Sequence, residues 1–368
     1  MNSGDSSNQR GTNFKTNRVT PYIVIAAIGG IVILFQTFIS GCSNDKETVK
    51  KNNHDTHSMS VAELFAEEHV WKAPDTASIP ADEEGKLIAY GRKLMIHTTH
   101  YFGPNGSVSK THNGLTCQNC HLDAGTRPYG NNLGVVSTTY PRFLPRCGTV
   151  LNIAEKVNEC FLRSLNGAGI DTAGKEMKGL VAYIEWLGKD VKKGDKFDGS
   201  GGITAIKFID RAADPAKGKI VFEQYCSRCH GTNGEGQFVA DVMKDETKQQ
   251  GGTATAEDLY YYPPLWGNNS FNGVATLYRV SKLAGFIKYN MPYPVDYKNP
   301  VLTDEQAWDV AAYVNNSSRP IKDHSEDYAC DISKKPFDFP FAPYADNFSE
   351  EQHKFGPYTA MPSAMKKH

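Results

Sequence analysis

Apolar residues recur at steps of three and four positions in several stretches of the chain, and this spacing predicts amphipathic α-helices. Three such stretches occupy the first part of the sequence. They cover residues 82–97, 152–165 and 174–187. A stretch rich in Gly, Lys and Asp follows at residues 188–202 and indicates a domain boundary. The first part of the chain therefore predicts a small helical domain whose helices are joined by loops.

The same order of elements begins again after this break. Asp214 and Pro215 predict the start of a helix that ends near Tyr225, because Asp caps helix N-termini and Pro suits the first helical position. A long loop follows. Thr303 and Gln306 then have the spacing of a capping box at the start of a closing helix. This order predicts a second domain with the architecture of the first.

The segments outside these two series have little periodicity. Residues 320–368 are rich in Pro and aromatic residues, so we expect an irregular C-terminal strap that packs over the domains. Residues 42–80 are largely polar and predict a linker with one short helix that begins near Ser60. The expected fold is mostly α, with two similar domains in tandem at residues 81–195 and 203–319.

The N-terminal residues 1–41 have the features of an export signal. A polar segment with three basic residues precedes an uncharged apolar run at residues 21–39, as in a signal peptide. The run ends in Ile-Ser-Gly-Cys, which resembles a bacterial lipobox whose Cys42 would receive a lipid. An uncleaved transmembrane anchor is the alternative, because the run is long enough to cross a bilayer. Either form places the rest of the chain on a membrane tether outside the cytoplasm, on the periplasmic side.

The charge balance limits the classes of partner. Lys and Arg number 40 and Asp and Glu number 41, which gives a formal net charge of −1 over 368 residues. No global field therefore attracts nucleic acid or an acidic membrane surface. Any anion that the protein binds must be held by local positive groups.

Two copies of the pattern Cys-x-x-Cys-His carry the clearest chemistry. They are Cys117-Gln-Asn-Cys120-His121 and Cys226-Ser-Arg-Cys229-His230. In this pattern two thiols form thioethers with haem vinyl groups, and the His supplies the proximal iron ligand. A structural zinc site is the alternative, but it needs Cys pairs that complete one tetrahedron and no His after each pair. We therefore predict two covalently bound haem c groups in two class I cytochrome c domains.

Each haem iron needs a second ligand on its distal side, and that ligand sets its potential and reactivity. Met291 is the candidate in the second domain, because it lies 61 residues (291 − 230) after His230 and precedes Pro292. The proline would hold the ligand loop rigidly. A Met that fills a gap in the core is the alternative, and Met243 is a second candidate for the ligand.

The first domain contains no equivalent stretch. Met177 lies among apolar positions of a predicted helix, as expected for a core residue. Cys160 is the other candidate, because a thiolate is a strong donor that lowers the haem potential and is also a sulfur nucleophile. A single Cys on a helix can equally be a small buried apolar residue. The residues alone leave this ligand open.

The chain from about residue 82 to residue 357 resembles the dihaem thiosulfate dehydrogenases, which couple two thiosulfates into tetrathionate and in some members also reduce tetrathionate. The most specific shared pattern is Asn-x-Cys-Phe-x-Arg-Ser-x-Asn-Gly, found here at residues 158–167. The tail at residues 340–357 also resembles the C-terminal strap of that family. In the family the Cys of this pattern is the distal ligand of the first haem, which implies that role for Cys160.

The resemblance also implies a set of substrate residues and a path for electrons. Arg146 and Ser164 fall on substrate-binding positions, and Lys156 falls where we expect Arg, which keeps the charge but loses the planar fork. Arg163 adjoins these positions and could equally be a surface residue or a haem propionate partner. Cys160 would form a transient covalent link with a sulfane sulfur. Electrons would then leave through the second haem to an external acceptor such as another cytochrome c.

Some residues depart from the family pattern. Asn290 precedes the candidate ligand where the family often has Lys. Cys147 and Cys330 have no place in the pattern, and they could form a disulfide or remain free thiols. A membrane-tethered dihaem electron carrier without catalytic activity is the alternative function, as is oxidation of another sulfur anion. A carrier would have no need of a sulfur ligand flanked by anion-binding groups.

Overall fold

The computed structural model describes residues 69–244 and 254–361. The export signal at residues 1–41, the lipidation candidate Cys42 and the short helix expected near Ser60 lie outside these ranges. Within the described ranges, no helix is long and apolar enough to cross a membrane.

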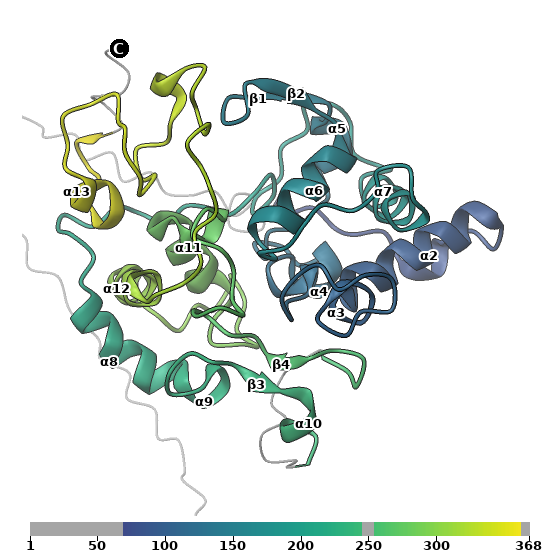
Figure 1. Ribbon diagram of the computed structural model, residues 1–368, viewed down its shortest axis with the longest axis horizontal. Coiled ribbons are helices and arrows are strands. Elements are labelled where there is room, and N and C mark those ends of the chain that lie inside the picture. Colours follow the sequence, from purple (N-terminus) through teal and green to yellow (C-terminus); the bar gives the residue numbers. More distant parts are fainter. Residues whose placement is uncertain (1–68, 245–253, 362–368) are drawn as a thin grey trace, which may run out of the picture. The chain divides into compact units, whose positions relative to one another are not determined.

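The first half of the described chain (residues 69–202) runs from blue to teal in Figure 1. Its helices are α2 (Glu83–Ile96), α3 (Thr98–Phe102), α4 (Leu122–Gly125), α5 (Val136–Thr139), α6 (Ile153–Arg163) and α7 (Lys175–Leu187). Short 3-10 turns occupy Thr76–Ser78 and Cys117–Asn119. Strands β1 (Arg142–Leu144) and β2 (Thr149–Leu151) form an antiparallel hairpin in which Phe143 pairs with Val150.

The second half (residues 203–319) repeats a helical plan. Its helices are α8 (Pro215–Tyr225), α9 (Ser227–His230), α10 (Val239–Val242), α11 (Val280–Asn290) and α12 (Asp304–Asn316). A 3-10 turn covers Thr276–Tyr278, and strands β3 (Gln237–Phe238) and β4 (Tyr260–Tyr262) pair in antiparallel fashion. The strap (residues 320–361) contains a 3-10 turn at Ile332–Lys334 and α13 (Glu350–Phe355).

The predicted helix starts are confirmed by their caps. The Asp82 carboxylate accepts a backbone hydrogen bond in the first turn of α2. Asn152 and Glu155 form a reciprocal capping box at the start of α6, and Thr303 and Gln306 form another at the start of α12. These bonds satisfy amides that have no partner within the helix, so the sequence itself determines where each helix begins.

Each half contains a close helix crossing at a glycine. Gly91 of α2 lies against α7, where a Cβ at Gly91 would overlap the carbonyl oxygen of Gly179. Gly218 of α8 lies against α12 in the same way, where a Cβ would overlap the carbonyl oxygen of Asp309. In both halves, a glycine without a side chain lets the first and last long helices approach closely. This shared crossing is a physical basis for the repeat predicted from the sequence.

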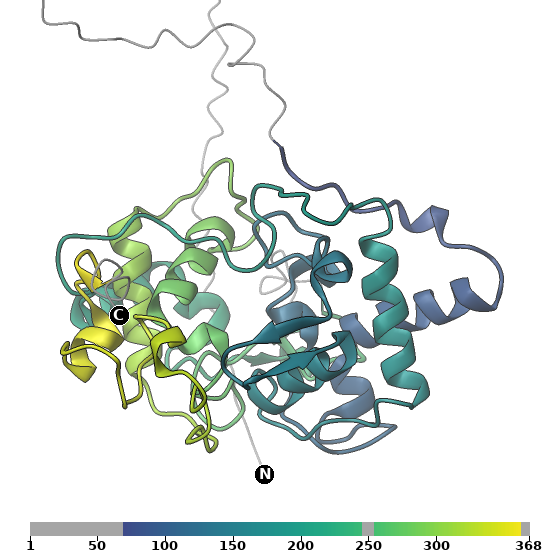
Figure 2. The same cartoon turned by 90° about the horizontal axis from the view of Figure 1, so that it is seen from above.

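The strap contacts both halves of the protein (Figure 2). Asp338 is fully buried and accepts hydrogen bonds from Arg279 and Ser281 at the start of α11. On the other side, the backbone amide of Tyr328 donates to the carbonyl oxygen of Arg146, 3.0 Å away. Apart from its short helical turns the strap is irregular, as the sequence predicts.

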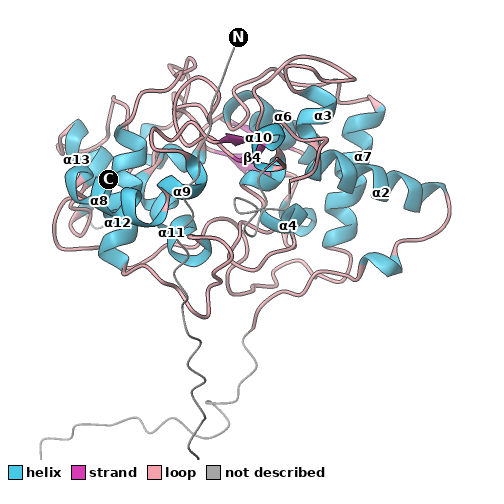
Figure 3. Ribbon diagram, turned by 90° about the horizontal axis from the view of Figure 1, so that it is seen from below, coloured by secondary structure: helices cyan, strands magenta, loops and turns pink. Residues whose placement is uncertain are grey.

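The apolar core is continuous through both halves. Helices account for most of its regular structure, and the strands are short (Figure 3). Polar contacts also join the halves, because Asn113 Nδ2 donates to the Ser270 oxygen at 2.8 Å and the Asn272 amide donates to the Arg163 oxygen at 3.2 Å. These contacts fix the orientation of the two Cys-x-x-Cys-His motifs relative to each other.

Gly91→Ala should destabilise the protein by about 1–3 kcal/mol, because the added methyl group forces the α2 and α7 backbones apart. Gly218→Ala should have the same effect in the second half. Denaturant unfolding of each variant measures the change, with exposed Lys86→Ala on α2 as a control expected within about 0.5 kcal/mol of wild type. Stabilisation by Gly91→Ala, the usual outcome at an open helical site, would contradict the close crossing.

Candidate functional site

The first Cys-x-x-Cys-His motif holds its histidine in one tautomer. His121 Nδ1 lies 2.7 Å from the backbone carbonyl oxygen of Asn131. A carbonyl can only accept, so Nδ1 carries the proton and Nε2 keeps its lone pair. At the start of the 3-10 turn Cys117–Asn119, the Thr116 amide donates to Asn119 Oδ1 at 2.8 Å, which orients the motif. His121 Nε2 is therefore prepared to bind a metal ion.

The second motif repeats this arrangement. His230 Nδ1 lies 2.8 Å from the carbonyl oxygen of Pro263 and donates to it. Burial lowers the pKa of His230 below its usual value, which keeps the imidazole neutral. Both motif histidines are therefore held through Nδ1 by a backbone carbonyl, which leaves Nε2 as the atom that could bind a metal ion.

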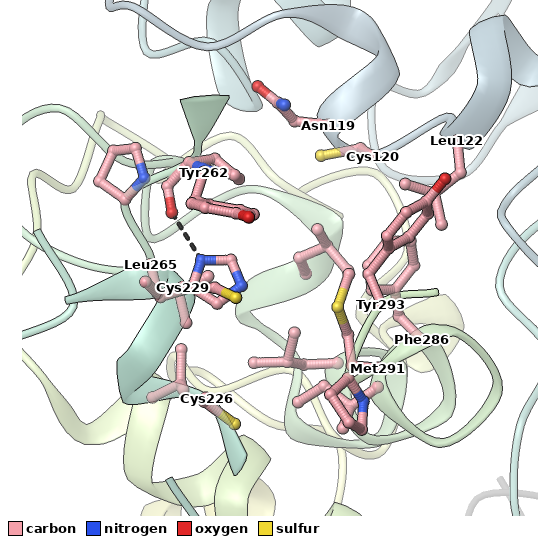
Figure 4. A pocket seen from close by; sticks show the side chains of 18 of the residues that line it. Asn119, Cys120, Leu122, Cys226, Cys229, Tyr262, Leu265, Phe286, Met291 and Tyr293 are labelled. Carbon is pink, nitrogen blue, oxygen red and sulfur yellow. Dashed lines mark hydrogen bonds between the residues drawn. The ribbon is translucent and has the colours of Figure 1, made fainter. Parts of the chain in front are cut away.

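An apolar cavity lies beside the second motif (Figure 4), with about 1310 Å³ of empty space including its open mouth. Its walls include Tyr262, Leu283, Phe286, Ile287 and Val310. Cys226, Cys229 and His230 line it together with Met291, and Figure 4 shows the sulfur atoms of Cys229 and Met291 facing the same space. Two thiols and an imidazole facing a thioether across an apolar space fit a covalently held haem, so the donor set suits the group that the motif predicts.

The first motif borders the same cavity. Cys120 lines it with Gln118 and Asn119, and Figure 4 shows the Cys120 side chain at its edge. A group attached at Cys120 would therefore lie next to a group held in the cavity. The two motifs form neighbouring centres rather than separate sites.

The loop that carries Met291 is attached to the first half. Asn290 is fully buried, and its Nδ2 atom donates to the Phe286 oxygen at 2.9 Å and to the Tyr129 oxygen at 3.1 Å. Arg127 Nη2 donates to the Val295 oxygen at 2.6 Å. Asn290, which departs from the family pattern, thus joins the Met291 loop to the first half.

Cys160 lies on α6 and faces the first motif. Burial raises the pKa of its thiol, but the charge of Lys156 and a hydrogen bond with His121 act in the opposite direction, and the pKa is lowered from its usual value. Because Asn131 occupies His121 Nδ1, Nε2 is the atom left to face the Cys160 sulfur. Met177 is fully buried in α7, as predicted for a core residue.

The other predicted substrate residues lie on or next to α6, the helix that carries Cys160. Lys156, Cys160 and Ser164 follow one another at steps of four residues, which places them along one face of α6 and its C-terminal cap. Arg146 lies in the turn between β1 and β2, where it forms an ion pair with Glu159. The structure therefore brings the four residues predicted from the resemblance into one region of the first half.

Two acidic residues in this region were not predicted from the sequence. Glu159 pairs with Arg146 and lies 3.5 Å from Arg163 Nε, and Asp327 of the strap pairs with Arg163. The spacing of four residues between Glu159 and Arg163 was a usable signal for one contact. No sequence signal connects Asp327 to the site, because the contact depends on the path of the strap.

Cys147 and Cys330 are both exposed and are not joined by a disulfide. They nevertheless lie on adjacent segments, because a Cβ at Gly148 would touch the Cys330 sulfur. Cys147 also lies 3.9 Å from Glu159 Oε2. The disulfide considered from the sequence thus remains a prediction for oxidising conditions.

Comparisons with known proteins identify the family of the chain. The sequence model of the SoxA/TsdA cytochrome c domain matches residues 107–192, and that of cytochrome c matches residues 215–318. The thiosulfate dehydrogenase of Psychrobacter arcticus is 35% identical over 251 residues, which are 68% of this chain and 69% of that protein. This chain belongs to the thiosulfate dehydrogenase family.

Other members of the thiosulfate dehydrogenase family are similar to the chain in sequence and fold. The enzyme of Stutzerimonas stutzeri is 32% identical over 255 residues, which are 69% of this chain and 75% of that protein. A solved structure of thiosulfate dehydrogenase (TsdBA) from Marichromatium purpuratum matches with a TM-score of 0.58 and 28% identity. The match covers 71% of this chain and 51% of that one, so this chain spans about half the length of the solved protein. These matches confirm two tandem, mostly helical cytochrome c domains, which are haem-binding domains.

Diamide should join Cys147 to Cys330 in the reduced native protein, because Cys330 lies against the residue that follows Cys147. Peptide mapping without reductant would detect the linked pair, and Cys330→Ser should abolish it. If both thiols remain open to alkylation after diamide treatment, the two segments are not adjacent in solution.

Proposed function

We propose that this family member oxidises two thiosulfate ions to one tetrathionate ion and passes two electrons to an external acceptor such as another cytochrome c. The observation that carries this proposal is Cys160, which faces His121 and is activated by the charge of Lys156. An electron carrier needs no activated sulfur among cations. The activity named for the relatives supports the same reaction. The site would also reduce tetrathionate when the external partner supplies two electrons, because attack of the Cys160 thiolate on the central sulfur–sulfur bond releases one thiosulfate and the two electrons release the other.

The proposal includes one haem c in each domain. The covalent attachment residues are Cys117, Cys120, Cys226 and Cys229, and the proximal ligands are His121 and His230. Cys160 and Met291 would hold the two irons together with these histidines. Each haem iron, when bound, supplies a one-electron acceptor. A thiolate ligand lowers a haem potential and a thioether raises it, which favours electron flow from the first centre to the second.

The first domain would bind two anions in succession, and its cations make this possible. Thiosulfate is a dianion, so coupling brings like charges together and requires positive groups at the site. Arg146 and Lys156 supply that charge, and Ser164 supplies a hydroxyl donor. Arg146 Nη1 is buried and has no hydrogen-bond partner among the described residues, so it is available to a substrate oxygen.

Cys160 would act as the nucleophile in two half reactions. In the first, its thiolate forms a bond with the sulfane sulfur of one thiosulfate, and two electrons leave. In the second, the sulfane sulfur of another thiosulfate attacks that sulfur and breaks its bond to Cys160. Tetrathionate then departs and Cys160 is again a thiolate. The sum is two thiosulfates minus two electrons, with no net proton transfer.

The contact between the two centres would carry the electrons outward. Cys120 of the first motif lines the cavity of the second, so the first attachment site borders the proposed acceptor. Electrons then reach the Met291 side of the protein without crossing a long stretch of chain.

The location and domain limits complete the proposal. The catalytic domain covers residues 81–195, the electron-transfer domain residues 203–319 and the strap residues 320–368. A lipid on Cys42 would tether these parts to the membrane outside the cytoplasm.

Cys160→Gly should reduce kcat for thiosulfate-dependent reduction of an artificial acceptor by at least about 100-fold, because the nucleophile is lost. Electron paramagnetic resonance of the wild type should contain a His/thiolate low-spin haem signal that the variant lacks. Cys330→Ser is the matched control and should retain full activity.

Full turnover by Cys160→Gly would exclude the proposed mechanism. A wild-type protein that carries both haems but does not oxidise thiosulfate would favour an electron carrier. Turnover of sulfite instead of thiosulfate would favour action on another sulfur anion.

Met291→Ala should lower the potential of one haem by about 0.1 V or more and leave the other unchanged, because the thioether ligand is lost. Spectropotentiometric titration measures both potentials. Met243→Ala is the control, since Met243 is exposed at the end of α10 and should affect neither potential. A shift caused by Met243→Ala but not by Met291→Ala would reverse the ligand assignment.

A further inference from the structure

The anion site contains a charged residue from the distant C-terminal strap. Arg163 Nη1 lies 2.8 Å from Asp327 Oδ2, and Arg163 Nη2 bonds to Asp327 Oδ1. The two residues are 164 positions apart in the sequence. The Asp327 side chain is 8% exposed and that of Arg163 is 16% exposed. This bidentate pair is therefore well shielded from water. Charge-assisted hydrogen bonds are strong in such an environment.

Glu159 connects this pair to the substrate residue Arg146. The Glu159 Oε2 atom accepts a hydrogen bond from Arg146 Nη2, and it also lies 3.5 Å from Arg163 Nε. Because Asp327 binds both Nη groups of Arg163, only Nε is left near Glu159. Of the two arginines, only Arg146 donates a direct hydrogen bond to Glu159, whose Oε2 atom also accepts a weak one from the Cys147 thiol. The four side chains form a row of alternating charge.

Arg146 has a buried donor group that no described residue occupies. Its side chain is 15% exposed, and Nη1 has no hydrogen-bond partner among the described residues. The strap also holds the Arg146 backbone, because the amide of Tyr328 donates to its carbonyl oxygen at 3.0 Å. A buried donor without a partner is costly, so this atom is best explained by an anion that binds there. The strap acts on Arg146 through neighbouring residues, Asp327 and Tyr328.

We propose that Asp327 is a positioning residue of the thiosulfate site. Asp327 binds both Nη groups of Arg163, so Arg163 does not compete for Glu159. Glu159 then holds Arg146 in an orientation in which Nη1 can donate to a substrate oxygen. The inference rests on the proposed function for the identity of the anion. In this proposal the strap contributes a residue to the site of the catalytic domain, although the strap follows the second domain in the sequence.

Asp327→Asn tests the proposal by removing the charge and keeping the shape of the side chain. A carboxamide has one acceptor oxygen instead of two and no charge, so it cannot form the bidentate pair, and Arg163 should turn toward Glu159 and compete with Arg146. We expect KM for thiosulfate to rise about fivefold or more with kcat changed less than about twofold, because substrate binding is affected. The site gains positive charge in this variant, so an effect of charge alone would lower KM for a dianion. A lower or unchanged KM would overturn the proposal.

Two further variants separate positioning from attachment of the strap. Asp327→Glu restores the carboxylate and should recover most of the affinity. Phe341→Leu weakens the stacking of the strap on Tyr278 without a change in charge, and it should leave KM unchanged. If Phe341→Leu raises KM as much as Asp327→Asn, then Asp327 only holds the strap in place and the proposal is wrong.

A double-variant cycle tests the route through Arg163. In an Arg163→Gln background no guanidinium competes for Glu159, so adding Asp327→Asn should not change KM further. Neither Arg163→Gln nor the double variant contains an unpaired Arg163 charge. These two variants therefore provide the test if Asp327→Asn alone does not fold. A further rise in KM in the Arg163→Gln background would show that Asp327 does not act through Arg163, which contradicts the proposal.

Titration of the oxidised holoprotein with sulfate separates this inference from the proposed function. Sulfate is a dianion that cannot be coupled oxidatively, and calorimetry measures its binding directly. If the wild type does not oxidise thiosulfate, the proposed function fails, and weaker sulfate binding by Asp327→Asn still supports the positioning role. Equal or tighter sulfate binding by Asp327→Asn, or no binding by the wild type, would overturn it. If the wild type oxidises thiosulfate and Asp327→Asn has an unchanged KM, only the positioning role fails.

Discussion

The hydrogen bond between each motif histidine and a loop carbonyl is the interaction on which both centres depend. His121 donates to Asn131 and His230 donates to Pro263, and in each case the bond fixes which nitrogen can bind a metal. The loop that serves His121 has positive φ angles at Tyr129 and Asn131, near 58° and 57°. Non-glycine residues seldom adopt this conformation, so the packing around the loop must hold it in place. In the proposed function, the roles of Cys160 and Met291 depend on this orientation of the two histidines.

Much of this arrangement could be predicted from the sequence. Helix starts at Asn152 and Thr303 depend on side chains only three residues away, and the Cys-x-x-Cys-His pattern is local chemistry. Spacing alone could not decide the role of Cys160, because the shift of its thiol pKa depends on contacts with Lys156 and His121 that only the fold creates. The family pattern supplied what periodicity could not.

The parts that could not be predicted involve backbone atoms or distant partners. The oxygen atoms that accept from the histidines belong to peptide groups, and peptide groups are the same at every position. Asp327 meets Arg163 only because the strap returns to the first domain. Asn290 looked like the loss of a lysine, whereas in the structure its amide joins two segments of backbone. In each case the missing information was a tertiary contact rather than a residue type.

The attachment of the Met291 loop limits how the chain can be divided. Asn290 bonds to Tyr129 of the first domain, and Cys120 and Leu122 of that domain form part of the second domain's cavity wall. The C-terminal domain therefore depends on its neighbour, because removing the first half would expose this wall of the cavity to water and release the Met291 loop. The linker is part of the same region, because the Tyr129 amide donates to the Gly199 oxygen at 3.1 Å. Insertions between the two domains must therefore preserve both the linker contact and the Asn290 contact at Tyr129.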